Sequence, residues 1–151
     1  MNLDEYEAVM RARIELNGFT LIGVFGGPGP DFVYSVGLTA RGWPEVILIG
    51  SINPAFVEQI LTDLITSWFK AEKVILGDNL DMISFADGSS HALRVMEVDE
   101  TEALVSYGAQ VLFFYPDRDI KFVQALWPDV NGRFPDEPGF KRPETQPIIG
   151  R

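Results

Sequence analysis

The chain has 151 residues, of which 46% are hydrophobic and 23% are charged, a composition typical of globular rather than disordered proteins. It contains no cysteine, which excludes structural disulfides, thiolate catalysis and cysteine-ligated metal sites. Its formal net charge of −10 repels phosphate backbones, so we expect no nucleic-acid partner. The acidic N-terminus is no secretory signal, and no segment approaches the roughly 20 apolar residues that span a bilayer. We therefore expect a cytoplasmic protein with no membrane partner, folded as a single domain over residues 1–151.

The first half of the chain predicts two helices separated by three strands. Residues 1–17 are predicted as an N-terminal helix, because apolar residues recur near every 3.6 positions before the stop at Asn17-Gly18. Strands are predicted at 19–25, 32–38 and 45–50, and the short loop between the first two indicates a hairpin. Asn53-Pro54 is a typical start for a helix to about Lys70. Its predicted apolar stripe contains Phe56, Ile60, Leu61, Leu64, Ile65 and Trp68.

The second half predicts strands at 73–77, 81–88 and 90–98, with the middle one short or a loop. Asp99 and Glu102 have capping-box spacing and predict a helix to about Tyr115, with Gly108 as its weak point. A last strand is predicted at 119–127, and residues 128–151 form an irregular C-terminal tail. Since several strand connections are too short for a crossover helix, we expect an α+β fold. Its sheet is mostly antiparallel or mixed, with about three helices packed on it.

The chain shows no complete catalytic or cofactor-binding motif. The stretch "GGPGP" lacks the lysine and hydroxyl of a phosphate-binding loop, so it is predicted as a hairpin loop. His91 is the only histidine and lies within a predicted strand. A structural role is favoured there over a role as a catalytic base paired with a carboxylate. No metal site is predicted, and the cofactor, if one exists, is unknown.

Two predicted turns combine aromatic and polar residues. In the first, Trp43 and Pro44 either form a rim that stacks a flat ligand or close the end of the sheet. Glu45 precedes an apolar run, where a partly buried carboxylate needs a partner. The expected partner is Arg41, Arg94 or Arg133. In the second, Gln124 needs hydrogen-bond partners inside an apolar strand that Trp127-Pro128 ends. Arg133 is predicted to form an internal ion-pair latch with the acids around it, Asp129, Asp136 and Glu137. The alternative is an anion clamp.

Four blocks in order resemble the bacterial family called domain of unknown function 4262: "FVYSVGL", "GWPEVILIG", "QALWPDVNGRFPDEPGF" and "QPIIG". The resemblance extends from Gly18 to Gly150. It implies that the family's framework consists of Tyr34, Ser35, Gly37, Pro44, Glu45, Gln124, Trp127, Asp129, Arg133 and Gln146. Two residues depart from the pattern: Ser35 replaces the usual threonine, and Asp136 replaces the usual tryptophan. The resemblance implies no reaction.

Three functions are consistent with these features. The leading hypothesis is a small domain that binds a ligand or a protein partner where the Gly42–Glu45 turn meets the Trp127–Phe134 turn. Its predicted binding residues are Tyr34, Ser35, Trp43, Glu45, Gln124, Trp127, Asp129 and Arg133. The second hypothesis is a hydrolase or transferase with Glu45 or Asp129 as general base and Arg133 holding an anionic substrate. The third is an acidic interaction protein, such as an inhibitor or immunity protein, that covers a basic partner with a contiguous acidic patch. The oligomeric state stays open.

Overall fold

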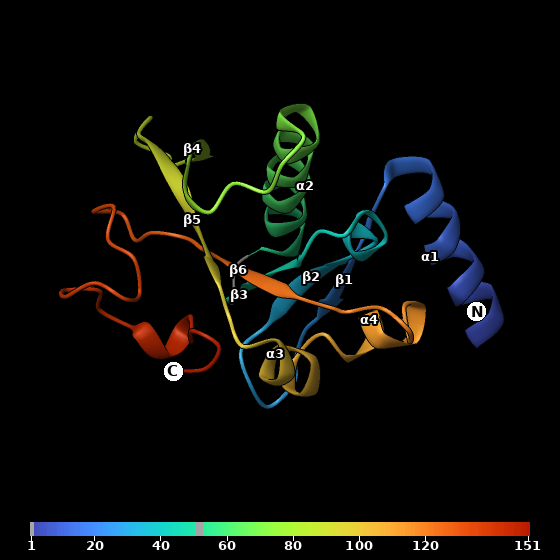
Figure 1. Cartoon of the computed structure of the whole chain (residues 1–151). Coiled ribbons are helices and arrows are strands. Elements are labelled where there is room, and N and C mark those ends of the chain that lie inside the picture. Colours follow the sequence, from blue (N-terminus) through green and yellow to red (C-terminus); the bar gives the residue numbers. More distant parts are fainter. Residues whose placement is uncertain (1, 51–52) are drawn as a thin grey trace.

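A computed structural model describes residues 2–50 and 53–151 of the chain (Figure 1). Met1, the first residue of the predicted N-terminal helix, lies outside the described residues. The helices are α1 (Leu3–Asn17), α2 (Pro54–Ala71), α3 (Glu100–Ser106) and α4 (Ala109–Phe114), with 3-10 turns η1 (Leu38–Arg41) and η2 (Pro143–Thr145). The strands are β1 (Thr20–Val24), β2 (Phe32–Val36), β3 (Glu45–Ile49), β4 (Gly77–Ser84), β5 (Ser90–Glu97) and β6 (Phe122–Leu126). None of the described helices is both long and apolar enough to cross a bilayer.

The strands form one sheet in the order β1-β2-β3-β6-β5-β4. The central pair, β3 and β6, is parallel, and the other neighbours are antiparallel. The sheet is therefore mixed, and the predicted α+β fold class is confirmed. In the parallel pair Glu45 lies opposite Phe122, so both strands begin at the same end of the sheet.

Helices cover both faces of this sheet (Figure 1). Residues of α2 pack on one face, where Val46 and Leu48 of β3 join the first core cluster. The other face contacts α1, α3, α4 and the end of the tail, and there Ile47 and Ile49 join the second cluster. Because β3 is buried on both faces, all five of its residues are buried, including the charged Glu45.

The start of α2 follows its sequence signals. The Asn53 side chain accepts hydrogen bonds from the backbone N–H groups of Ala55 and Phe56, and Pro54 takes the first turn. The predicted apolar stripe is wrong at one position. Phe56 is 42% exposed, and Val57 is the residue of the first turn that packs into the core.

The single helix predicted from Asp99 to Tyr115 is divided into α3 and α4, and the break at Tyr107-Gly108 falls at the predicted weak point. Asp99 caps α3 as predicted. A Cβ at Gly108 would lie 2.4 Å from the Phe122 ring, so the break brings the backbone against that side chain. Tertiary packing on β6 thus overrides the helical pattern.

The strand predicted at 73–77 is also wrong. β4 begins at Gly77 and runs past Asp81, where a separate strand was predicted. Its pairing with β5 shifts register between Asn79 and Ile83, and Asp81 adopts a left-handed φ of 57° within this irregularity. The Asn79 side chain accepts a hydrogen bond from the Trp68 indole at 3.0 Å, which fixes β4 to α2.

Two buried glutamines hold the C-terminal tail against β6. Gln124 donates to the Pro147 carbonyl at 2.8 Å and accepts from the Ile149 N–H at 2.9 Å. Gln146 accepts from the Trp127 N–H at 2.8 Å and donates to the Trp127 carbonyl at 2.9 Å. The tail has little regular structure, yet these amides satisfy backbone groups as a neighbouring strand would.

We predict that Gln146→Ala lowers the free energy of unfolding by about 2–3 kcal/mol, because both backbone groups of Trp127 lose their partner in a buried site. Urea denaturation measures this change. Gln59→Ala is the control, since Gln59 lies on the exposed face of α2 and its side chain bonds only Asp63 among the described residues. That variant should change stability by less than about 0.5 kcal/mol. Equal, small losses in both variants would show that the tail is not held by Gln146.

Candidate functional site

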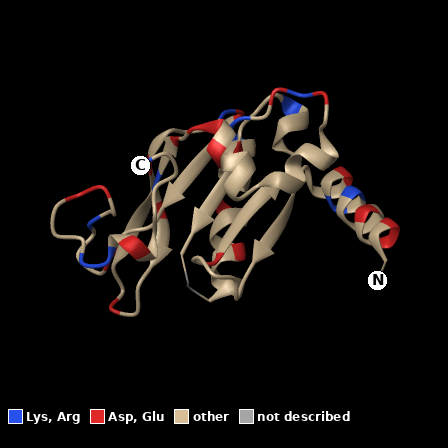
Figure 2. Ribbon diagram, turned by 90° about the horizontal axis from the view of Figure 1, so that it is seen from below, with Lys and Arg blue, Asp and Glu red and all other residues tan. Residues whose placement is uncertain are grey.

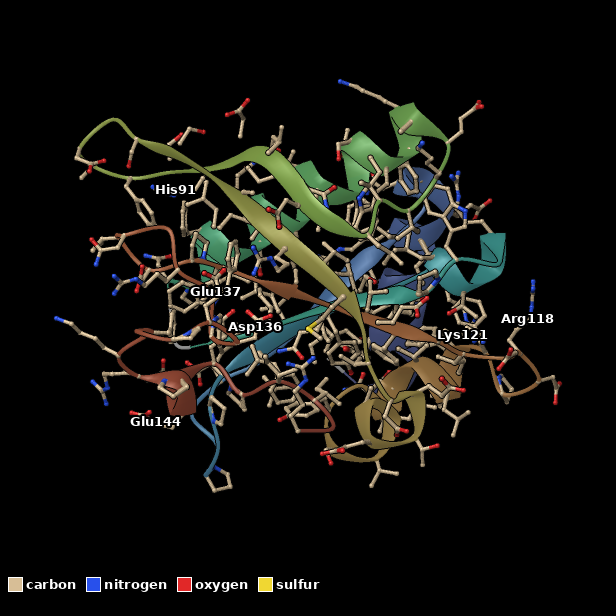
Figure 3. The ribbon with its side chains drawn as sticks, turned by 60° about the vertical axis from the view of Figure 1, so that its left-hand side comes forward. His91, Arg118, Lys121, Asp136, Glu137 and Glu144 are labelled. Carbon is tan, nitrogen blue, oxygen red and sulfur yellow. The ribbon has the colours of Figure 1, made fainter. Side chains whose placement is uncertain are left out.

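The two turns predicted to form one pocket lie at opposite ends of the sheet. Glu45 begins β3, whereas Trp127 follows β6 and its indole donates to the carbonyl of Ile49 at the far end of β3. Arg118 and Lys121 come just before β6, at the same end of the sheet as Glu45, whereas Asp136 and Glu137 come after Trp127. Figure 3 shows these two pairs on opposite sides of the molecule. The pocket expected between the turns is therefore not formed, and each turn has its own surroundings.

Glu45 is fully buried and its carboxylate accepts five hydrogen bonds. Two come from the hydroxyls of Ser35 at 2.7 Å and Thr39 at 2.6 Å. Three come from consecutive backbone N–H groups of Gly37, Leu38 and Thr39, at 3.2, 3.2 and 2.8 Å. The carboxylate thus satisfies the N–H groups at the start of η1, which have no partner inside that short turn.

The arginine partner predicted for Glu45 is wrong: its partners are hydroxyls and backbone N–H groups. Burial raises the pKa of Glu45, and the hydrogen bonds from Thr39 and Ser35 oppose this rise. Ser35 also accepts a hydrogen bond from the Val46 N–H at 2.9 Å. A hydroxyl is therefore needed at position 35, and serine supplies it as threonine does in the family pattern.

Tyr34, another predicted binding residue, lies in the core. It is 1% exposed and its ring stacks near Phe32, with ring centres 6.2 Å apart. Burial raises the pKa of Tyr34 to about 12, partly offset by a hydrogen bond from the backbone of Gln110. The tyrosine packs the second core cluster, and its phenol faces protein rather than solvent.

Gln124 and Trp127 are also engaged inside the molecule. Gln124 is fully buried beneath the tail. The Trp127 indole donates to Ile49 at 3.2 Å and lies so close to Gly50 that a Cβ there would be 2.8 Å from its nitrogen. Only glycine fits beneath this ring, at a φ of 149°. Trp127 therefore closes this end of the sheet.

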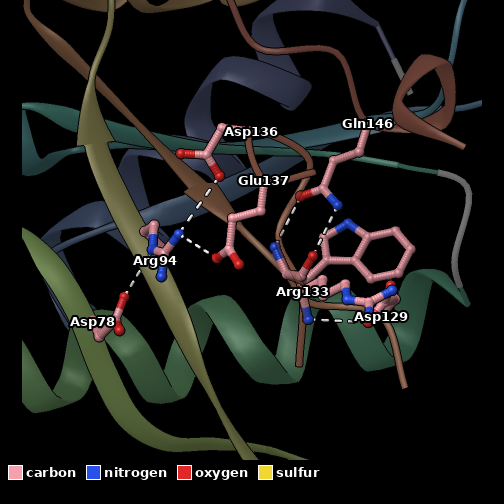
Figure 4. Close-up of polar contacts among 8 residues, drawn as sticks. Asp78, Arg94, Asp129, Arg133, Asp136, Glu137 and Gln146 are labelled. Carbon is pink, nitrogen blue, oxygen red and sulfur yellow. Dashed lines mark hydrogen bonds and ion pairs between the residues drawn. The ribbon is translucent and has the colours of Figure 1, made fainter. Parts of the chain in front are cut away.

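Arg133 does not form the predicted latch. Among the residues that the structure describes it makes no ion pair, and it donates to the Gly139 carbonyl at 3.3 Å. Asp129 instead organises its own turn by accepting the backbone N–H groups of Asn131 and Arg133 at 2.9 and 3.0 Å. Both residues shape the loop (Figure 4).

The latch exists, but its arginine is Arg94 on β5 (Figure 4). Its guanidinium lies 2.7 Å from Glu137, 2.9 Å from Asp78 and 3.5 Å from Asp136. It also lies 4.0 Å from the centre of the Phe134 ring. Asp136, where the resemblance led us to expect tryptophan, adds an acid to this network.

His91 lies on β5, as Arg94 does, and its contacts are with neighbouring side chains of the protein. It hydrogen-bonds Ser89 at 3.1 Å, and its ring centre is 4.7 Å from that of Phe85. Neither Glu45 nor Asp129 contributes to this contact. The Glu45 version of the carboxylate-based enzyme is not formed, because Glu45 is enclosed at the opposite end of the sheet from Arg133. Asp129, the alternative base, lies beside Arg133 and accepts a hydrogen bond from its backbone N–H.

Trp43 is half-buried: it packs against the first core cluster and also borders open space. Trp43 follows η1, which ends at Gly42 with a left-handed φ of 77°. The Trp43 backbone N–H donates to the Leu38 carbonyl. Its ring centre lies 5.7 Å from that of Phe69. The Arg41 guanidinium covers both rings, at 5.1 Å from Trp43 and 4.2 Å from Phe69.

Two hollows border Trp43. The larger, about 660 Å³, lies towards α1 and α2 and is lined by Glu15, Leu16, Asn17, Gly18, Arg41, Trp43, Phe69 and Glu72. The smaller, about 240 Å³, lies towards the start of β6 and is lined by Thr39, Gly42, Trp43, Arg118, Asp119 and Lys121. The sequence singled out Trp43 but not Arg118 or Lys121, because nothing in a polar loop shows that it will lie beside η1.

We predict that Glu45→Gln lowers the free energy of unfolding by about 2–4 kcal/mol, because a neutral amide cannot accept from all five donors in a buried site. Chemical denaturation measures the loss. Glu58→Gln, an exposed change on α2, is the matched control and should stay within about 0.5 kcal/mol of the parent. A Glu45→Gln variant as stable as this control would refute the structural role of the carboxylate.

The family comparison covers most of the chain and supplies no activity. No curated protein and no solved structure matched the chain. A family model described as a domain of unknown function, DUF4262, matches residues 13–141. This range includes η1, Glu45, Trp127 and Arg94, though not Gln146. The chain therefore belongs to the DUF4262 family.

Proposed function

We propose that this protein binds a small anionic molecule with a flat ring at Trp43. The observation that carries the proposal is the position of Trp43: it is half-buried, borders two hollows, and stands on a turn that a buried carboxylate holds in place. The other predicted binding residues make contacts inside the protein or shape a loop. Trp43 therefore has the ring surface available for a ligand.

The charges around Trp43 favour an anion. Arg41, Arg118 and Lys121 are exposed there, in a protein whose net charge is −10. Within the described residues Arg41 and Arg118 have no carboxylate within ion-pair distance, and Lys121 reaches only Asp119, at 4.0 Å. Three cations near an aromatic ring provide both charge and a stacking surface for a planar acid.

The two hollows give the ligand an orientation. The ring contacts Trp43 beside Arg41 in the larger hollow, whose volume of about 660 Å³ falls within the usual range of ligand sites. The acidic group points to Arg118 and Lys121 in the smaller one. Glu15, Glu72 and Asp119 line the rims and disfavour highly charged ligands. The ligand class is therefore a flat molecule with one acidic group.

The test uses a panel of aromatic carboxylates and adenosine 5′-monophosphate, each paired with a neutral analogue such as adenosine. We expect the acidic member of at least one pair to shift the Trp43 indole signal in NMR spectra and to bind about tenfold more tightly than its analogue. Lys121→Glu should remove most of this preference. Lys141→Glu makes the same charge change on the distant tail and should leave it intact.

Two results would contradict the proposal. One is a panel in which no acid perturbs Trp43 at millimolar concentration. The other is an equal loss of binding in Lys121→Glu and Lys141→Glu, which would show that net charge rather than this site governs the interaction.

A further inference from the structure

An apolar hollow of about 540 Å³ lies between the first turns of α1 and the start of α4, on surface that the Trp43 site does not use. It is lined by Leu3, Asp4, Tyr6, Glu7, Ala109, Gln110 and Phe113. The Tyr6 hydroxyl donates to the Gln110 side chain at 3.2 Å and joins the two helices beside the hollow. The hollow is thus formed by segments far apart in the sequence.

Large apolar side chains stand exposed around it. Leu3 is 85% exposed and Phe113 is 62% exposed. Phe113 contacts Phe114 edge to face, with ring centres 5.4 Å apart, while Phe114 itself is buried. Exposed apolar residues gathered at a hollow mark an interaction surface, because their transfer from water to a partner is favourable.

The charged residues that line this hollow are acids, and the nearby Arg11 pairs with one of them. The charged residues that line it are Asp4 and Glu7, and neighbouring Glu5 is exposed as well. Glu7 is paired with Arg11 at 2.8 Å, whereas Asp4 has no cation within ion-pair distance among the described residues. α4 carries no charged residue. An apolar base with an acidic rim complements an apolar residue flanked by cations.

We propose that this hollow docks a segment of another protein in which a large apolar side chain is flanked by lysine or arginine. The apolar side chain packs on Phe113 and Leu3, and its basic neighbours pair with Asp4 and Glu5. A second copy of the chain is disfavoured, because a twofold contact through this surface brings the same acids against each other. An anionic membrane is disfavoured by the same charges.

The acids of the chain as a whole do not form one face. They occur on α1, on the β4–β5 hairpin, on α3 and on the tail (Figure 2). The contiguous acidic patch hypothesised from the net charge is therefore not formed. The interaction surface that we propose is the apolar hollow with its acidic rim.

The test measures fluorescence anisotropy with a labelled peptide that carries a leucine pair flanked by lysines. Matched peptides replace the leucines with alanine or the lysines with glutamate. We expect the leucine–lysine peptide to bind most tightly and to shift the NMR signals of Tyr6, Gln110 and Phe113. Phe113→Ser should weaken it at least about tenfold. Leu80→Ser removes an exposed leucine of β4 and should have no effect.

A charge exchange completes the test. Asp4→Lys should weaken the lysine peptide and strengthen the glutamate peptide, and Leu3→Ser provides a second apolar variant if Phe113→Ser does not fold. Equal binding of all peptides, or binding unchanged by these variants, would overturn the proposal. So would self-association, or attachment to phosphatidylserine vesicles, that Phe113→Ser abolishes while peptide binding persists.

Discussion

The Trp43 turn depends on the hydrogen bonds that the buried carboxylate of Glu45 accepts. A charge at 0% exposure inside the central strand is unfavourable unless donors replace its water, and five donors do so. All of them belong to the end of β2 and the start of η1, so the carboxylate joins β3 to the turn that leads into it. Glu45 is thus a positioning group. It fixes η1, and η1 in turn places Arg41 and Trp43.

The opposite end of the sheet is closed by side-chain amides and ion pairs. Gln124 and Gln146 supply hydrogen bonds in place of a further strand, Trp127 covers Gly50, and Arg94 joins β4, β5 and the loop that carries Glu137. An irregular segment becomes ordered in this way without regular secondary structure of its own. The end with the most diagnostic sequence block is consequently closed by internal contacts, and the ligand surface that we propose at Trp43 lies at the other end.

The sequence was sufficient to predict the elements that depend on local turn and capping chemistry. The Asn53-Pro54 start of α2, the hairpin at 20–36 and the cap at Asp99 follow from turn and capping chemistry, and the mixed α+β class follows from short connections. Long-range contacts decided the rest. The break at Gly108 depends on Phe122, and the choice of Arg94 over Arg133 depends on β5 lying beside the tail loop. Glu45 was expected to be partly buried and is fully buried. The sequence could not identify its partners, because every residue except proline has a backbone N–H group.

Amide hydrogen exchange at Gly37, Leu38 and Thr39 tests the central claim most directly. These N–H groups donate to a carboxylate enclosed in the core, so they should exchange nearly as slowly as those of Ile47 and the rest of β3, despite belonging to a short turn. Gly27 and Gly29 in the exposed β1–β2 loop supply the reference for fast exchange. Exchange at the three turn amides as fast as in that loop would show that Glu45 does not hold the turn, and would contradict the account of the Trp43 site built on it.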